Sequence, residues 1–70
     1  MMPLTIAGTD EEHVIKKVGG SPEIRSHLED MGLVCGGTVR VISAAGEDLI
    51  VSVKGVRIAL NDQLARKIMV

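Results

Sequence analysis

The sequence contains no phenylalanine, tyrosine or tryptophan. Proteins that bind single-stranded nucleic acid stack bases on aromatic rings, and domains that bind proline-rich peptides use aromatic-lined grooves. A patch for a phosphate backbone is also missing, since 8 Lys and Arg are scattered among 9 Asp and Glu and the net charge is −1. We therefore expect neither a nucleic-acid partner nor a proline-rich ligand.

The chain also lacks the features of a secreted or membrane-inserted protein. Its one cysteine cannot form an internal disulfide. The first segment, MMPLTIAGTDEE, has no basic lead and no long apolar core, so it does not resemble a signal peptide. No apolar run approaches the roughly 20 residues that cross a bilayer. These absences predict a cytoplasmic protein.

Aliphatic side chains are what remain to build a core. Val and Ile alone supply 16 residues, and β-branched residues at this density favour strands over helices. Seventy residues are enough for one domain, so we expect residues 1–70 to form a single, mainly β domain.

One segment, over about residues 22–31, has helix signals at both ends. Ser21 suits the N-cap, and Pro22 suits the first helical turn. An apolar stripe with helical spacing consists of Ile24, Leu28 and Met31. Gly32 suits the left-handed residue that ends a helix, after which Leu33 can fold back on the last turn. The pattern predicts one α-helix here.

Short strands and turns are predicted on both sides of this helix. A first strand is expected over residues 13–18, ended by a glycine pair. Three more are expected over residues 38–43, 49–53 and 56–60, with a tight turn at Lys54-Gly55 between the last two. In the last strand the alternation predicts one buried face, formed by Val56, Ile58 and Leu60.

The C-terminal segment completes the predicted fold. Asn61 suits the N-cap of a short helical turn over residues 62–67, and residues 68–70 can return as an edge strand. Several short strands are typical of a small barrel, whose closure removes exposed edges. We predict an SH3-like barrel with one inserted α-helix. At an open edge, residues 68–70 can pair between copies and give a weak homo-oligomer.

Two groups of residues have metal-binding chemistry. Glu23, His27 and Asp30 recur at i, i+4 and i+7 on the predicted helix, a spacing that can hold a divalent metal but more often marks a solvated face. His13, beside two glutamates, is a weaker candidate. Cys35 follows the helix C-terminus, where nothing favours a reactive thiolate, so we expect a small buried hydrophobe.

Motifs for catalysis are missing. The sequence has no GxxxxGK[ST] phosphate loop, no HExxH and no GxSxG. Ser26 and His27 are neighbours on the predicted helix, and adjacent helix positions point apart. We therefore expect no catalytic residue, no cofactor and no enzyme activity.

Nearly the whole chain resembles the FeoA family, which comprises small cytoplasmic proteins of bacterial ferrous iron uptake. The most specific pieces are Met31-Gly32-Leu33-Val34 with Gly36, and GVRIAL over residues 55–60 followed by the short capped helix. The resemblance implies an SH3-like barrel, similar to the C-terminal domain of DtxR-like metal-dependent repressors. It also implies an accessory partner of FeoB, the membrane ferrous iron transporter with a cytosolic GTPase domain. Repression is not implied, because the helix-turn-helix and metal-sensing parts are missing.

One departure from the family concerns Cys35, where its members commonly carry proline. Proline would stiffen the turn through its fixed φ. The resemblance therefore implies a looser turn here, with a thiol that can be reached.

The leading hypothesis is a non-enzymatic module that binds the cytosolic part of a ferrous iron transporter and modulates transport or assembly. Its partner surface is expected at the helix end and the following turn, with two arginines at the rim: Arg25, Met31, Leu33, Val34, Cys35 and Arg57. For Met31 and Leu33, a place in the core is at least equally expected.

Two alternatives stay open. The first is a small divalent-metal-binding protein or metallochaperone that uses Glu23, His27, Asp30 or Cys35. The second is an RNA-binding SH3-like barrel of ribosomal type, whose binding would fall steeply with added salt.

Overall fold

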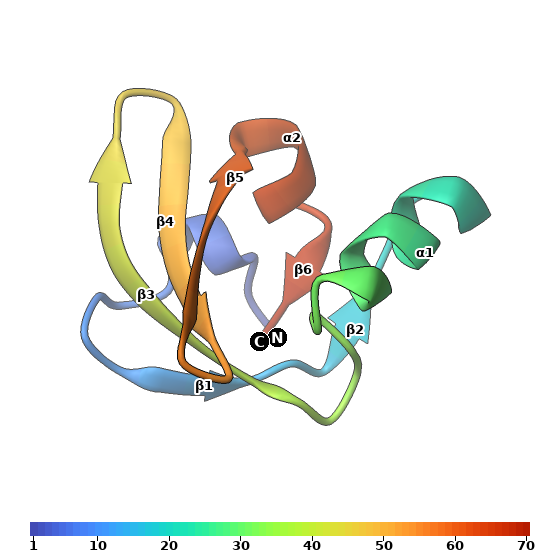
Figure 1. Ribbon diagram of the computed structural model, residues 1–70, viewed down its shortest axis with the longest axis horizontal. Coiled ribbons are helices and arrows are strands. Elements are labelled where there is room, and N and C mark those ends of the chain that lie inside the picture. Colours follow the sequence, from blue (N-terminus) through green and yellow to red (C-terminus); the bar gives the residue numbers. More distant parts are fainter.

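The computed structural model describes all 70 residues as two small β-sheets that share one core (Figure 1). The larger sheet is antiparallel with the order β1-β3-β4-β5, and the smaller one pairs β2 with β6. The strands are β1 Glu12–Val14, β2 Lys17–Val18, β3 Thr38–Ala45, β4 Asp48–Val53, β5 Val56–Asn61 and β6 Ile68–Met69.

Two helices connect these strands, and one 3-10 turn precedes them. Helix α1 (Pro22–Asp30) is inserted between β2 and β3, the short helix α2 (Asp62–Ala65) lies between β5 and β6, and a 3-10 turn (Leu4–Ile6) precedes β1. None of the helices is long and apolar enough to span a lipid bilayer. The predicted mainly β fold with one inserted α-helix and a C-terminal helical turn is confirmed, although α2 ends two residues before the predicted position 67.

The strand predicted over residues 13–18 is wrong, because two strands in different sheets occupy this segment. The chain changes sheets at Ile15, whose N–H donates to the Gly37 carbonyl at 2.8 Å and whose carbonyl accepts from the Gly36 N–H at 2.7 Å. The next N–H, of Lys16, donates instead to the carbonyl of Met69 in β6 at 2.8 Å. Apolar alternation cannot reveal such a change, since the fully buried Ile15 faces the same core from either sheet.

Both predicted ends of α1 are confirmed. The Ser21 side chain accepts a hydrogen bond from the Ile24 N–H at 3.3 Å. At the other end, the Leu33 N–H donates to the Leu28 carbonyl and the Gly32 N–H to the Glu29 carbonyl, at 3.0 and 2.9 Å. These two bonds, with Gly32 at φ +89°, form a Schellman motif. It ends the helix and turns Leu33 inward, and the side chains of Leu28 and Leu33 are both fully buried.

The three central strands form a meander with two-residue turns. Lys54 and Gly55 both have positive φ, 52° and 81°, as a type I′ turn between β4 and β5 requires. A second tight turn at Gly46 joins β3 to β4. β3 therefore runs on to Ala45, two residues beyond the predicted end, with a bulge between Val41 and Ser43.

Burial along β5 differs from the predicted pattern of one fully buried face. Val56, Ile58 and Leu60 do share a face, because they pair with the buried Val53, Val51 and Leu49 of β4. Only Leu60 is buried, whereas Ile58 is half-buried and Val56 is 60% exposed. The reason is that β5 is the last strand of its sheet, so its hairpin end lacks a neighbour on one side.

The C-terminal residues do not form the open edge that the sequence suggested for pairing between copies. In β6, Met69 pairs with Lys17 of β2 and forms a bridge to Pro3. Val70 then exchanges two backbone hydrogen bonds with Met2, at 2.9 and 2.8 Å. Ile68 and Val70 are buried as well. This edge is occupied within the chain itself.

The core consists of 13 buried side chains, all of them apolar. Its members come from both sheets, from α1 and α2 and from the segments between them: Leu4, Ile15, Leu28, Leu33, Val39, Val41, Leu49, Val51, Val53, Leu60, Ala65, Ile68 and Val70. Cys35 is not among them, so the prediction of a buried thiol is wrong. It lies at an exposed turn that no strand or helix covers.

A substitution at Gly32 tests the geometry of the helix end. A Cβ at Gly32 would require a non-glycine residue at φ +89° and would stand 3.2 Å from Val53 Cγ1. Gly32→Ala should lower the free energy of unfolding by about 1–3 kcal/mol from the backbone alone, measured by urea denaturation with circular dichroism. Gly36→Ala is the matched control, because Gly36 has φ +88° but no atom within 4 Å of its Cβ position. If the two variants lose the same free energy of unfolding, the contact between residue 32 and Val53 contributes nothing.

Candidate functional site

The predicted partner surface at the end of α1 is only partly exposed. Leu33 has no exposed surface and belongs to the core, so its place on the predicted surface is wrong. Met31 is half-buried and packs against the core, Val34 is 37% exposed, and Cys35 is exposed. We call Met31, Val34 and Cys35 the helix-end surface.

A tight turn gives the helix-end surface its shape. The Gly37 N–H donates to the Val34 carbonyl at 2.9 Å, and Gly36 in between has φ +88°. These features define a type II turn with Cys35 at its second position. The turn also needs glycine at residue 37, where a Cβ would stand 3.1 Å from the Val34 carbonyl oxygen. The Cys35 thiol donates a hydrogen bond to the Lys16 carbonyl at 3.2 Å.

The hairpin of β4 and β5 adjoins this surface. Val53 connects the two, since its Cγ1 lies 3.2 Å from the Cβ position of Gly32 and its partner across the hairpin is Val56. Val56 therefore lies on the face of the sheet that is turned toward the helix end. Exposed or half-buried apolar side chains from α1, the following turn and the hairpin are thereby brought to one region of the molecule.

The two predicted rim arginines lie in different places. Arg25 is an exposed residue of α1, on the element that leads into the helix-end surface. Arg57 pairs with Ser52 in β4, which pairs with Arg40 in β3, and alternation turns this row away from Val56 and Ile58. Arg57 therefore faces the opposite side of the sheet and is not at the rim of the helix-end surface.

The metal-binding alternative finds no assembled ligand set. Glu23, His27 and Asp30 are all exposed on α1. No group of three or more His, Cys, Asp or Glu side chains anywhere in the chain lies close enough to hold a metal ion. The other histidine, His13, donates from its Nε2 to the Gly8 carbonyl at 3.0 Å.

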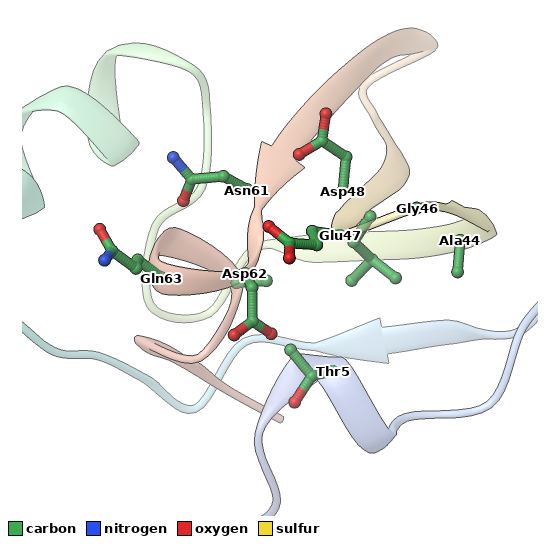
Figure 2. Close-up of a pocket in the computed structure, with 10 residues that line it drawn as sticks. Thr5, Ala44, Gly46, Glu47, Asp48, Asn61, Asp62 and Gln63 are labelled. Atoms are coloured by element: carbon green, nitrogen blue, oxygen red, sulfur yellow. The ribbon is translucent and has the colours of Figure 1, made fainter.

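An acidic hollow lies at the other end of the sheet, between the β3–β4 turn and α2 (Figure 2). It has a volume of about 570 Å³ and is lined mainly by polar side chains, among them Thr5, Glu47, Asp48, Asn61, Asp62 and Gln63. The Arg66 Nε donates to the Asp62 carboxylate at 2.8 Å, an exposed pair that adds little stability. Its three carboxylates, those of Glu47, Asp48 and Asp62, make the hollow negatively charged, so it suits a cationic group.

Sequence reasoning missed this hollow, although one signal was available. The predicted turn at Lys54-Gly55 fixes the register of the hairpin, and that register places Asp48 opposite Asn61. The acidic residues beside these two, Glu47 and Asp62, must then come close as well. The 3-10 turn that supplies Thr5 had no comparable signal.

Three comparisons with known proteins agree on the same family. The model of the FeoA domain matches residues 2–70. A protein of Methanocaldococcus jannaschii, provisionally named Fe(2+) transport protein A, is 37% identical over 70 residues, which is all of this chain and 85% of the relative.

Solved structures show the same fold. An iron uptake regulatory protein, FeoA, is similar with a TM-score of 0.88 and 32% identity over 97% of this chain and 92% of its own. The FeoA of Stenotrophomonas maltophilia, a procaryotic SH3 domain protein solved with zinc, has a TM-score of 0.83 and 27% identity over 99% of this chain and 88% of its own. The predicted SH3-like barrel is confirmed.

Replacing Cys35 by proline tests how rigid the turn at the helix-end surface is. The second position of a type II turn favours proline, and the Cys35 N–H makes no backbone hydrogen bond that proline would remove. Cys35→Pro should raise the free energy of unfolding by about 0.4–1 kcal/mol, because the unfolded chain loses freedom. Denaturant titration measures the change. Cys35→Ala is the control, because it also loses the hydrogen bond of the thiol. If Cys35→Pro is no more stable than Cys35→Ala, the type II turn is wrongly assigned.

Proposed function

The chain belongs to the FeoA domain family, and on that premise we propose that it is a non-enzymatic, cytoplasmic accessory protein of bacterial ferrous iron uptake. In this proposal it binds the cytosolic GTPase region of an FeoB-type membrane transporter. Binding modulates transport or the assembly of the transporter. The match of the FeoA domain model over residues 2–70 is the observation that carries the proposal.

The named relatives support the same role. The Methanocaldococcus jannaschii protein bears the name of an Fe(2+) transport protein. The Stenotrophomonas maltophilia FeoA has been suggested to act as a bacterial ferrous iron transport activating factor. Contact with a transporter, as proposed for this chain, requires a surface suited to protein binding.

We place this contact on the helix-end surface. Met31 and Val34 offer apolar area, Arg25 supplies charge on the adjoining helix, and Met and Arg are both enriched at interfaces. The buried Leu33 and the Schellman motif beneath it hold the surface in one conformation, which lowers the entropy cost of binding. Cys35 stands at the tip of the turn, where its thiol is accessible to a partner.

An NMR titration tests the proposal directly. The ¹⁵N-labelled protein is titrated with the cytosolic GTPase region of an FeoB-type transporter, in chelator, with and without bound nucleotide. We expect shifts concentrated between Arg25 and Gly37. No shift in any nucleotide state would overturn the proposed partner.

A pair of aspartate variants tests the surface. Val34→Asp should weaken binding about tenfold or more, because it places a charge in the apolar contact. The fold should tolerate this change, since aspartate is favoured at the first position of a β-turn. Ile6→Asp is the matched control: Ile6 is also an exposed aliphatic residue, 68% exposed, but lies in the 3-10 turn. Equal losses of affinity in the two variants would sink the assignment of the helix-end surface.

A further inference from the structure

One edge of the larger sheet is open. β5 is the terminal strand and pairs only with β4, and neither α2 nor β6 joins its other side. None of the backbone hydrogen bonds outside the regular elements involves Val56, Arg57, Ile58 or Ala59. An edge strand of this kind is a template on which another strand can pair.

The hairpin turn determines which backbone groups of β5 face the open edge. Val53 and Val56 flank a two-residue turn, so they form a hydrogen-bonded pair, and the pairs along the hairpin then alternate. The N–H and carbonyl of Arg57 and of Ala59 therefore point outward. The pairing of β3 with β4 is consistent with this alternation. It predicts that the carbonyl of Val41, opposite Val51, points away from β4, and this carbonyl accepts a hydrogen bond from the Asp10 N–H at 2.7 Å.

The side chains along this edge protect it only by one charge, that of Arg57. The strand contains no proline and no inward-pointing charge, and Val56, Arg57 and Ala59 are exposed. Val56 and the half-buried Ile58 leave apolar surface beside the outward-facing backbone groups.

Charges are separated along the sheet. Basic residues outnumber acidic ones at the end that carries the β4–β5 turn, where Arg40, Lys54 and Arg57 lie with one carboxylate, that of Glu12, which pairs across the strands with Arg40. Acidic residues gather at the opposite end, around the hollow of Figure 2: Glu47, Asp48 and Asp62. Antiparallel pairing of two such strands sets the basic end of each copy beside the acidic end of the other.

We propose that β5 pairs antiparallel with β5 of a second copy of this chain, around a twofold axis at Ile58. Arg57 of each copy then lies opposite Ala59 of the other, so that the outward-facing backbone groups form hydrogen bonds with each other. The same register directs Lys54, in the β4–β5 turn, toward Asp62, the first residue of α2, whose side chain is 43% exposed and also pairs with Arg66 of its own chain. A twofold axis at Arg57 would place the two Arg57 guanidinium groups opposite each other, where their charges repel. A twofold axis at Ala59 would move Lys54 of one copy away from Asp62 of the other. This pairing does not depend on the proposed transporter contact.

The dimer is expected to be weak and sensitive to salt. One strand pair covers less surface than the roughly 1,000 Å² of a stable specific interface, so we expect a dissociation constant on the order of 10⁻⁴ M. Its charged contacts are exposed to solvent, so added salt should weaken it further.

Sedimentation of the full chain from about 10 µM to about 1 mM tests this, at low and high salt. Ala59→Pro removes an outward-facing N–H, a change that an edge strand tolerates, and should weaken dimerisation at least tenfold. Ala59→Ser keeps this N–H and should not weaken it.

Lys54→Asn suits the type I′ turn and removes the cation, so it should weaken the dimer severalfold and reduce its salt dependence. A wild-type chain that stays monomeric throughout, or an Ala59→Pro variant that dimerises like wild type, would overturn the proposal.

Amide exchange gives an answer even if the proline variant fails to fold. In the wild-type chain, exchange at Arg57 and Ala59 should slow as protein concentration rises, while exchange at Ile58, already bonded to β4, should not change. Dimerisation without slowing at Arg57 and Ala59 would place the contact elsewhere and refute the β5 pairing.

Discussion

The fold depends on the pair of backbone hydrogen bonds that hold Ile15 against Gly36 and Gly37. At this point the chain leaves the larger sheet for the smaller one, and the turn after α1 returns to begin β3. Ile15 is fully buried, so its own N–H and carbonyl are shielded from water and each would carry a full desolvation penalty if unpaired. The two sheets and the helix end are thereby fixed relative to one another at one residue.

Local signals in the sequence predicted much of the fold. The cap at Ser21, the stop at Gly32 and the turn at Lys54-Gly55 each involve residues close in sequence, and all three are present. The sheet change at Ile15 and the paired β6 depend on contacts between residues far apart, which periodicity does not encode. The open edge of β5 was missed for the same reason. Which strand is terminal depends on the order of the strands in the sheet, and that order is set by contacts between distant residues.

The candidate site was predicted less well than the fold. Alternation and helical spacing indicate which face a side chain shares, but exposure depends on what covers that face. Leu33 folds completely into the core, whereas Cys35, two residues later, lies at the tip of a turn with no covering element. Arg57 lies on the opposite face from Val56 because neighbouring residues of a strand alternate, and this much the predicted strand already implied. Composition alone therefore identifies the kind of surface available, while its position requires the fold.

The two ends of the chain meet, since Met2 and Val70 exchange backbone hydrogen bonds and the N and C labels lie side by side in Figure 1. A domain closed in this way can be placed within a loop of a larger protein without stretching it, because both connections leave from one point. The same closure permits circular permutation: the ends can be joined by a short linker and the chain reopened at the exposed turn of Gly46.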